Sequence, residues 1–177
     1  MQGTGAPMRR QARPLVQPPD ALTALRLPLA LAFLLFDGTA ARLAIVLVAA
    51  VTDFVDGIWA RRIGGSRLGA VLDPVCDKAF IVSAFAVVFH SGVLTPLELL
   101  GVLSRDVLAV LAFLGTWALR RPTTLPARAG GKAVTVGQLL TLIAFLAGSD
   151  LVRPLAWATA AISVYAIGDY GRAAWHR

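Results

Sequence analysis

The stretch that decides the fold and the chemistry reads Asp53-x2-Asp56-Gly57-x2-Ala60-Arg61-x7-Gly69-x3-Asp73-x3-Asp77. Strongly apolar sequence flanks it on both sides. Ionised carboxylates at or near a membrane span are costly unless something compensates them, and four that converge also repel one another. Divalent metal is the simplest compensation, because hard carboxylate oxygens suit Mg²⁺, Mn²⁺ or Ca²⁺. With glycine and arginine interleaved, the pattern indicates a metal site for a phosphorylated substrate.

The composition indicates a membrane protein with a single domain. Of the 177 residues, 57% are hydrophobic, which is too apolar for an ordinary soluble protein. The net charge of +7 does not indicate a nucleic-acid partner, because the basic residues fall between apolar segments. The single cysteine, Cys76, excludes an intrachain disulfide and is expected to be a small packing residue.

Six apolar segments are candidate membrane spans, since a spanning helix needs about 20 mainly apolar residues. They are 22–36, 40–60, 72–91, 96–119, 133–149 and 151–171. The first is short, so a further helix beginning at Pro18-Pro19 is expected to lead into it. Residues 1–19 are expected to form a mobile basic arm without a secretory signal, which leaves 20–177 as the membrane domain. The predicted fold is an all-α bundle of six transmembrane helices.

The distribution of basic residues predicts the orientation in the membrane. Gly38, Gly92 and Gly148-Ser149 mark tight turns on one side, where the loops hold only Arg42 and Arg153. The other side carries Arg9, Arg10, Arg13, Arg61, Arg62, Arg67, Arg120, Arg121, Arg128, Lys132, Arg172 and Arg177. Because cytoplasmic loops are enriched in Lys and Arg, both termini and the aspartate motif are expected on the cytoplasmic side.

The spacing of the aspartates predicts two acidic helix faces. Asp53 and Asp56 are three residues apart at the end of the second span, and Asp73 and Asp77 are four apart at the start of the third. The short loop 61–69 is expected to make these spans antiparallel neighbours, so that the two pairs face each other. A single aspartate here could equally cap a helix or pair with a loop arginine; four in this arrangement favour the metal site.

The motif resembles the signature of the CDP-alcohol phosphatidyltransferases, integral membrane enzymes of phospholipid synthesis. That signature reads Asp-x2-Asp-Gly-x2-Ala-Arg-x8-Gly-x3-Asp-x3-Asp, and all eight residue types are present here. The one departure is a spacing of seven residues rather than eight between Arg61 and Gly69, which affects the rim of the site. The resemblance covers nearly the whole chain and implies six spans around a cytoplasm-facing polar active-site cavity.

The resemblance also implies roles for individual residues. Asp53, Asp56, Asp73 and Asp77 would hold two divalent cations, Mg²⁺ or Mn²⁺. Asp77 would also be the general base that takes the proton from the acceptor hydroxyl. That hydroxyl attacks the lipid-bearing β-phosphorus of the substrate, and CMP leaves. The CDP moiety would be bound by Thr23, Asp56, Gly57, Ala60, Arg61, Ser66 and Gly69.

The segment from Pro19 to Arg26 resembles the opening Pro-Asn-x-Leu-Thr-x2-Arg of the family, with Asp20 in place of Asn. Asp20 is either a helix cap or a nucleotide contact, and the sequence leaves both open. Arg26 lies inside the first span, where an unpaired cation is costly, so a phosphate or carboxylate partner is expected. Arg26 is assigned to the acceptor site.

Two further basic residues are assigned to the acceptor, each with a structural alternative. Arg105, within Ser104-Arg105-Asp106, could face the acceptor's phosphate or simply pair with Asp106. Lys132 opens a segment that resembles Gly-Lys-x-Lys-Thr-x2-Gln, with Val134 in place of the second lysine. It could bind the acceptor's phosphate or extend to the membrane boundary as an ordinary interfacial lysine.

The expected function is transfer of a phosphatidyl group from CDP-diacylglycerol to a glycerol-type alcohol. The loss of a lysine at Val134 favours phosphatidylglycerol as acceptor, which would give cardiolipin; glycerol 3-phosphate is the alternative, and inositol phosphates come third. A transporter of ions or protons is the alternative from another class. The resemblance further implies a homodimer in the lipid bilayer. A multi-pass protein of the bacterial inner membrane is expected, and the charge distribution predicts no nucleic-acid partner.

Overall fold

The computed structural model describes residues 15, 17–63, 66, 69–118 and 129–175. Most of the expected basic arm therefore lies outside the described residues, as do Arg67 and the loop 119–128. The side chains of Ala60 and Arg61 are also not described, although both residues belong to a described helix.

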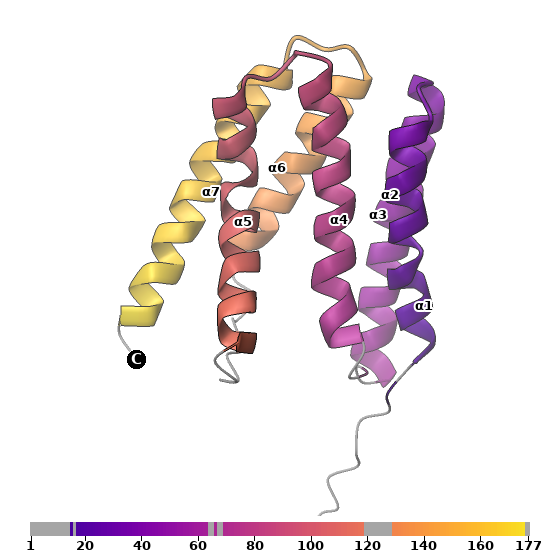
Figure 1. The fold of residues 1–177 in the computed structure, drawn as a ribbon, viewed down its shortest axis with the longest axis vertical. Coiled ribbons are helices and arrows are strands. Elements are labelled where there is room, and N and C mark those ends of the chain that lie inside the picture. Colours follow the sequence, from indigo (N-terminus) through magenta and orange to yellow (C-terminus); the bar gives the residue numbers. More distant parts are fainter. Residues whose placement is uncertain (1–14, 16, 64–65, 67–68, 119–128, 176–177) are drawn as a thin grey trace, which may run out of the picture.

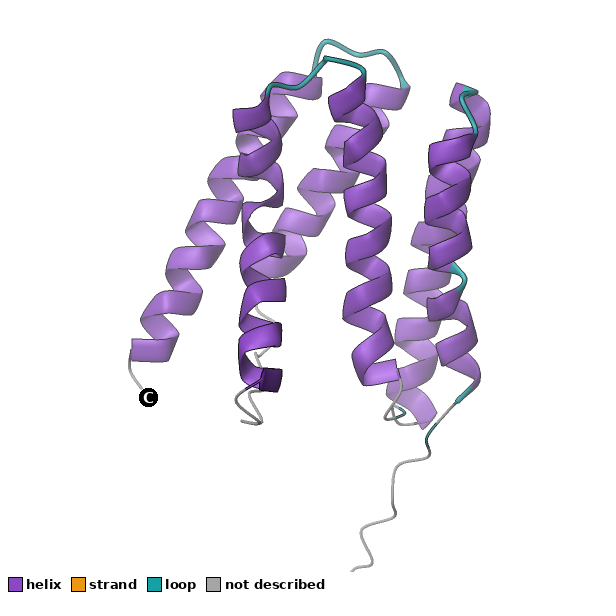
Figure 2. Cartoon of the chain, viewed as in Figure 1, coloured by secondary structure: helices purple, strands orange, loops and turns teal. Residues whose placement is uncertain are grey.

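The described residues form an all-α fold without strands, as the sequence predicts (Figures 1 and 2). The helices are α1 (Pro18–Ala24), α2 (Arg26–Leu35), α3 (Thr39–Ile63), α4 (Gly69–His90), α5 (Pro96–Ala118), α6 (Ala129–Leu146) and α7 (Val152–Trp175). Among the described residues, none of these helices combines the length and the apolarity that crossing a membrane requires. The six membrane spans stay a prediction.

Local sequence explains where the helices begin and end. Pro18 opens α1, and Asp20 stabilises that end because its Oδ2 accepts the backbone N–H of Gln17 at 2.7 Å. The short helix expected ahead of the first span is therefore present. Gly92 and Gly148 end α4 and α6 with φ angles of 75° and 63°, in the left-handed region that favours glycine.

Three tight turns gather at one end of the bundle and the aspartate motif lies at the other. Figure 1 shows the α2–α3, α4–α5 and α6–α7 turns at the top, while α1 begins and α7 ends at the bottom. The start of α4, with its two aspartates, is also at the bottom. The three turns expected from Gly38, Gly92 and Gly148 thus lie together at the end of the bundle away from the motif, and the placement of the basic clusters stays a prediction.

α4 occupies the middle of the bundle, since it packs on α1 and α2 and also on α5 and α6. Phe33 of α2 and Phe80 of α4 meet edge to face, with ring centroids 6.2 Å apart. Phe85 of α4 and Leu142 of α6 are both fully buried in the hydrophobic core. The central helix therefore connects the half that carries α1–α3 to the half that carries α5–α7.

Close backbone approach joins α7 to its neighbours. A Cβ atom at Gly101 of α5 would lie 2.7 Å from the Cβ of Ala160, and one at Gly137 of α6 would lie 2.5 Å from Thr159 Oγ1. Away from the aspartate motif, the buried carboxylate of Glu98 also ties α5 to α7, because it accepts Arg153 Nε and Trp157 Nε1, each at 3.0 Å.

Gly101→Ala should therefore lower the unfolding temperature. The added methyl group would meet Ala160 below van der Waals distance, and overpacking typically costs about 1–3 kcal/mol. Gly115→Ala in the same helix is the matched control, because nothing lies within 4 Å of the new Cβ there. It should be neutral or stabilising by up to about 1 kcal/mol through helix propensity. Equal unfolding temperatures for the two variants would contradict the close α5–α7 packing.

Candidate active site

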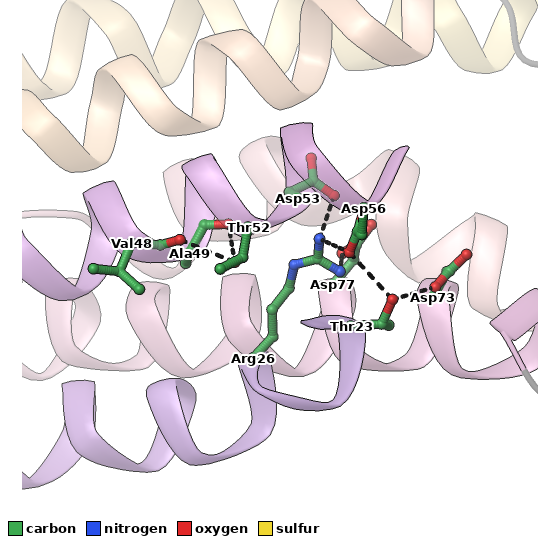
Figure 3. A network of polar contacts seen from close by, with 9 residues as sticks. All are labelled: Thr23, Arg26, Val48, Ala49, Thr52, Asp53, Asp56, Asp73 and Asp77. Atoms are coloured by element: carbon green, nitrogen blue, oxygen red, sulfur yellow. Dashed lines mark hydrogen bonds and ion pairs between the residues drawn. The ribbon is translucent and has the colours of Figure 1, made fainter. Parts of the chain in front are cut away.

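The four aspartates gather around the beginning of α2 (Figure 3). Asp53 and Asp56 come from α3, and Asp73 and Asp77 come from α4. One expectation about them is wrong: α3 and α4 do not pack directly against each other in the described residues, because α1 and α2 pack against both. The two acidic faces meet across side chains of these two helices, Thr23 and Arg26, rather than across a direct helix–helix contact.

Arg26 is the centre of this cluster. Its side chain is only 4% exposed, and its Nη2 lies 2.7 Å from both Asp53 Oδ1 and Asp56 Oδ2. Its Nη1 lies 3.0 Å from Asp77 Oδ1. One guanidinium thus pairs with carboxylates from both helices, which meets the expectation that this cation needs a charged partner. Its assignment to the acceptor site stays a prediction.

Thr23 bridges the two acidic faces one turn before Arg26. Its hydroxyl lies 2.7 Å from Asp73 Oδ1 and 3.2 Å from Asp56 Oδ2. Thr23 and Arg26 are three residues apart, so they present their polar groups on the same side of α1 and α2. Together they contact all four aspartates, and the CDP-binding role of Thr23 stays a prediction.

The aspartates differ in their access to solvent. The side chain of Asp56 is 10% exposed, whereas those of Asp77 and Asp53 are 45% and 58% exposed. Asp73 is also exposed. A substrate could therefore approach Asp77 without displacing the buried Asp56, an arrangement suited to the base role predicted for Asp77.

No group of three or more Asp, Glu, His or Cys side chains in the described part of the chain is arranged to hold a metal ion. The donor chemistry nevertheless fits divalent cations. The cluster offers carboxylate oxygens, the ligands that Mg²⁺ and Mn²⁺ prefer, and these oxygens already surround a positive charge. Asp53, Asp56, Asp73 and Asp77 are the residues that would hold such ions.

The predicted CDP-binding residues Ser66 and Gly69 form the rim of the site with Asp20. Ser66 Oγ donates to Asp20 Oδ1 at 2.8 Å and accepts the backbone N–H of Gly69 at 2.6 Å. A Cβ on Gly69 would lie 2.5 Å from Asp20 Oδ1, so a larger residue would break this contact. Asp20 is thus a helix cap that also contacts Ser66, three residues before α4 begins. Gly57 is half-buried in α3.

The three predicted acceptor-binding residues differ in their surroundings. Arg26 lies in the carboxylate cluster, and Lys132 is exposed on the first turn of α6. Arg105 Nη1 pairs with Asp106 Oδ1 at 3.0 Å, which is the local ion pair that the sequence left open.

A second polar cluster surrounds Asp106, and the sequence reading missed its extent. Lys78 Nζ contacts Asp106 Oδ1, and Gln138 Nε2 donates to Asp106 Oδ2 at 2.6 Å. Lys78 follows Asp77 directly, so the two side chains point about 100° apart on α4. Asp77 contacts Arg26, and Lys78 contacts Asp106. The charged Lys78 beside the motif was the available signal, but its partner Asp106 lies on α5, and Gln138, which also contacts Asp106, lies on α6.

The chain is similar to phospholipid-synthesis proteins along most of its length. A family model described as CDP-alcohol phosphatidyltransferase matches residues 16–165. The CDP-diacylglycerol–glycerol-3-phosphate 3-phosphatidyltransferase of Aquifex aeolicus is 34% identical over 131 residues, 71% of this chain and 72% of that protein. A Mycobacterium bovis protein named "Putative cardiolipin synthase" is 32% identical over 159 residues, 84% of this chain and 76% of that protein.

An Escherichia coli K12 protein with the same name as the Aquifex protein is 36% identical over 119 residues, 64% of this chain and 61% of that protein. No solved structure matches the chain at a significant level.

Proposed function

Because the chain belongs to the CDP-alcohol phosphatidyltransferase family, and is an enzyme of that family, we propose that it transfers a phosphatidyl group from CDP-diacylglycerol to a glycerol-type acceptor. The observation that carries this proposal is the convergence of the four motif aspartates on Arg26 and Thr23. It puts every carboxylate of the motif at one place, at the end of the bundle where α1 begins.

The residues of the cluster divide the chemistry among them. Asp77 takes the proton from the acceptor hydroxyl, whose oxygen attacks the β-phosphorus of CDP-diacylglycerol. A new ester bond forms as the bond from that phosphorus to the bridging oxygen breaks, and CMP leaves with the electron pair. Divalent cations held by the four aspartates would polarise the diphosphate and stabilise the charge of the leaving phosphate. Ser66 and Gly69, positioned by Asp20, border the nucleotide.

We place this chemistry at the cytoplasmic boundary of a membrane. Support comes from the many large apolar side chains on the outside of the helices, including Leu47 and Phe54 of α3, Leu111 of α5 and Val164 of α7. A soluble monomer rarely exposes so much apolar surface. The basic clusters that the sequence predicts on the same side as the motif support a cytoplasmic orientation, since cytoplasmic loops are enriched in Lys and Arg.

Phosphatidylglycerol is the acceptor that the side chains favour. Val134 is fully buried on the same face of α6 as Gln138, whose amide bonds Asp106. The interior beside the Asp106 cluster therefore has an apolar group where the resembled pattern has a lysine. Arg105 and Lys78 are both paired with Asp106. Fewer free cations suit the single charge of a phosphodiester better than the double charge of a phosphomonoester.

Glycerol 3-phosphate is the second candidate, and the relatives favour it. The Aquifex aeolicus and Escherichia coli proteins carry names that specify glycerol 3-phosphate, whereas the Mycobacterium bovis protein is named for cardiolipin synthesis. Both acceptors present a glycerol hydroxyl and a phosphate, so both are compatible with the same base and the same carboxylates.

An acceptor panel separates the two candidates. Purified enzyme with CDP-diacylglycerol and Mn²⁺ or Mg²⁺ should make cardiolipin from phosphatidylglycerol, as measured by CMP release and identification of the lipid product. Val134→Lys should shift the ratio of kcat/KM values towards glycerol 3-phosphate by about 10- to 150-fold, because one added charge-assisted contact is worth about 1.5–3 kcal/mol.

Ala133→Lys is the matched control, because Ala133 is exposed on the same helix and a lysine there adds charge without facing Gln138. CMP release with glycerol 3-phosphate and none with phosphatidylglycerol would reverse the order of the two acceptors. It would leave the base and the metal-binding residues as proposed.

A further inference from the structure

The burial of Arg26 has a consequence for metal binding. Its guanidinium is surrounded by three of the four motif carboxylates, and only 4% of the side chain is exposed. Asp56 Oδ2 receives both Arg26 Nη2 at 2.7 Å and the Thr23 hydroxyl at 3.2 Å. Three of the four carboxylates that would ligate a divalent cation thus each give one oxygen atom to the arginine.

The third nitrogen of the guanidinium, Nε, is left without a hydrogen bond in the described part of the chain. Arg26 Nε is buried and has no hydrogen-bond partner among the described residues. A buried donor without a partner is costly, so the geometry is held by the attraction of the carboxylates for a cation and not by full satisfaction of the arginine. Any stronger cation at the same oxygens should compete with it.

We propose that Arg26 is a built-in counter-ion of the carboxylate cluster, which neutralises part of its charge without metal and gives way when divalent cations bind. This inference rests on the proposed metal-dependent function. Arginine keeps its charge at all physiological pH values, so it can hold the aspartates in place before metal arrives. The displaced guanidinium stays beside the site, where its planar fork suits the phosphate oxygens of the substrate.

The inference predicts that removing the arginine strengthens metal binding. Arg26→Gln should lower the Kd for Mn²⁺ by about tenfold or more, because a positive charge near the ion is lost and the carboxylate oxygens are released. The readout is Mn²⁺ titration of purified protein by electron paramagnetic resonance or calorimetry, without substrate. Arg26→Lys keeps a positive charge but loses the planar fork of the guanidinium. Its Kd for Mn²⁺ should fall between those of wild type and Arg26→Gln.

Arg42→Gln is the matched control, since it removes the same charge elsewhere. Arg42 pairs with Asp37 at 3.0 Å and lies in the first turn of α3, at the end of that helix opposite Asp53 and Asp56. The Kd of Arg42→Gln for Mn²⁺ should equal that of wild type. Unfolding temperature gives a second readout: Arg26→Gln should be less stable than wild type in chelator, and saturating Mn²⁺ should restore most of that difference.

The outcomes separate this inference from the proposed function. A Kd for Mn²⁺ that is unchanged or weaker in Arg26→Gln, with binding intact in wild type, would overturn the counter-ion role alone. Absence of Mn²⁺ binding in wild type and in Arg26→Gln would overturn both the counter-ion role and the metal-dependent mechanism. If Arg26→Gln folds only with metal present, protein purified in Mn²⁺ and titrated with a chelator of known affinity gives the same comparison.

Discussion

Replacing Asp77 with asparagine should reduce phosphatidyl transfer by about 10²–10⁴-fold, the usual contribution of a general base. Asparagine is nearly isosteric with aspartate and its carbonyl oxygen can still ligate a hard cation, but it cannot accept the acceptor's proton. Binding of CDP-diacylglycerol should therefore be largely retained. Initial rates of CMP release, together with a direct measurement of substrate binding, test both parts of this expectation.

Cys76→Ala is the neighbouring control for Asp77→Asn. Cys76 precedes Asp77 on α4 but is completely buried, so its side chain packs in the interior and is not open to solvent as Asp77 is. Alanine is small, apolar and a good helix former, and the variant should keep nearly the activity of wild type. If Asp77→Asn retained more than about a tenth of the wild-type rate, the proton would have to go to another group.

Exhaustive removal of divalent cations should abolish turnover, and Mg²⁺ or Mn²⁺ should restore it. Arg26 brings one positive charge to four carboxylates, so without metal the cluster stays negative when the aspartates are ionised. A negative cluster repels the diphosphate of the substrate, and binding of CDP-diacylglycerol should weaken as well. Rates and substrate affinity in chelator, before and after metal is added back, measure these effects.

The control for this experiment is a chelator already saturated with Ca²⁺ or Mg²⁺, which tests for effects of the chelator itself. Full activity after complete removal of divalent cations would contradict the role given to Asp53, Asp56, Asp73 and Asp77. It would not affect the assignment of the chain to its family, which rests on the match over residues 16–165.

Much of the helical framework could be predicted from the sequence, because its signals are local. The expected segment 72–91 corresponds to α4 at Gly69–His90, and 96–119 corresponds to α5 at Pro96–Ala118. Long apolar runs bounded by glycine or proline specify a helix without reference to the rest of the chain. Differences of four residues occur at α6, which begins at Ala129 rather than at 133, and at α7, which ends at Trp175 rather than at 171.

The aspartate motif was also accessible from sequence, but its surroundings were not. The spacing of Asp53 and Asp56 predicts that they share a helix face. It does not predict that α1 and α2 pack between the helix of these two aspartates and the helix of Asp77. The contacts of Arg26 join residues 27 and more positions apart, and those of Asp106 join three helices. Such contacts depend on tertiary packing, for which a single sequence carries no periodic signal.

The most direct test of the account is whether release of CMP depends on the acceptor and matches the lipid product. Purified wild-type protein, given CDP-diacylglycerol, divalent metal and phosphatidylglycerol or glycerol 3-phosphate, should release one CMP for each phospholipid formed, and CMP added to that product should regenerate CDP-diacylglycerol. Solute or proton movement across vesicles without CMP release would contradict it and favour the transporter alternative instead.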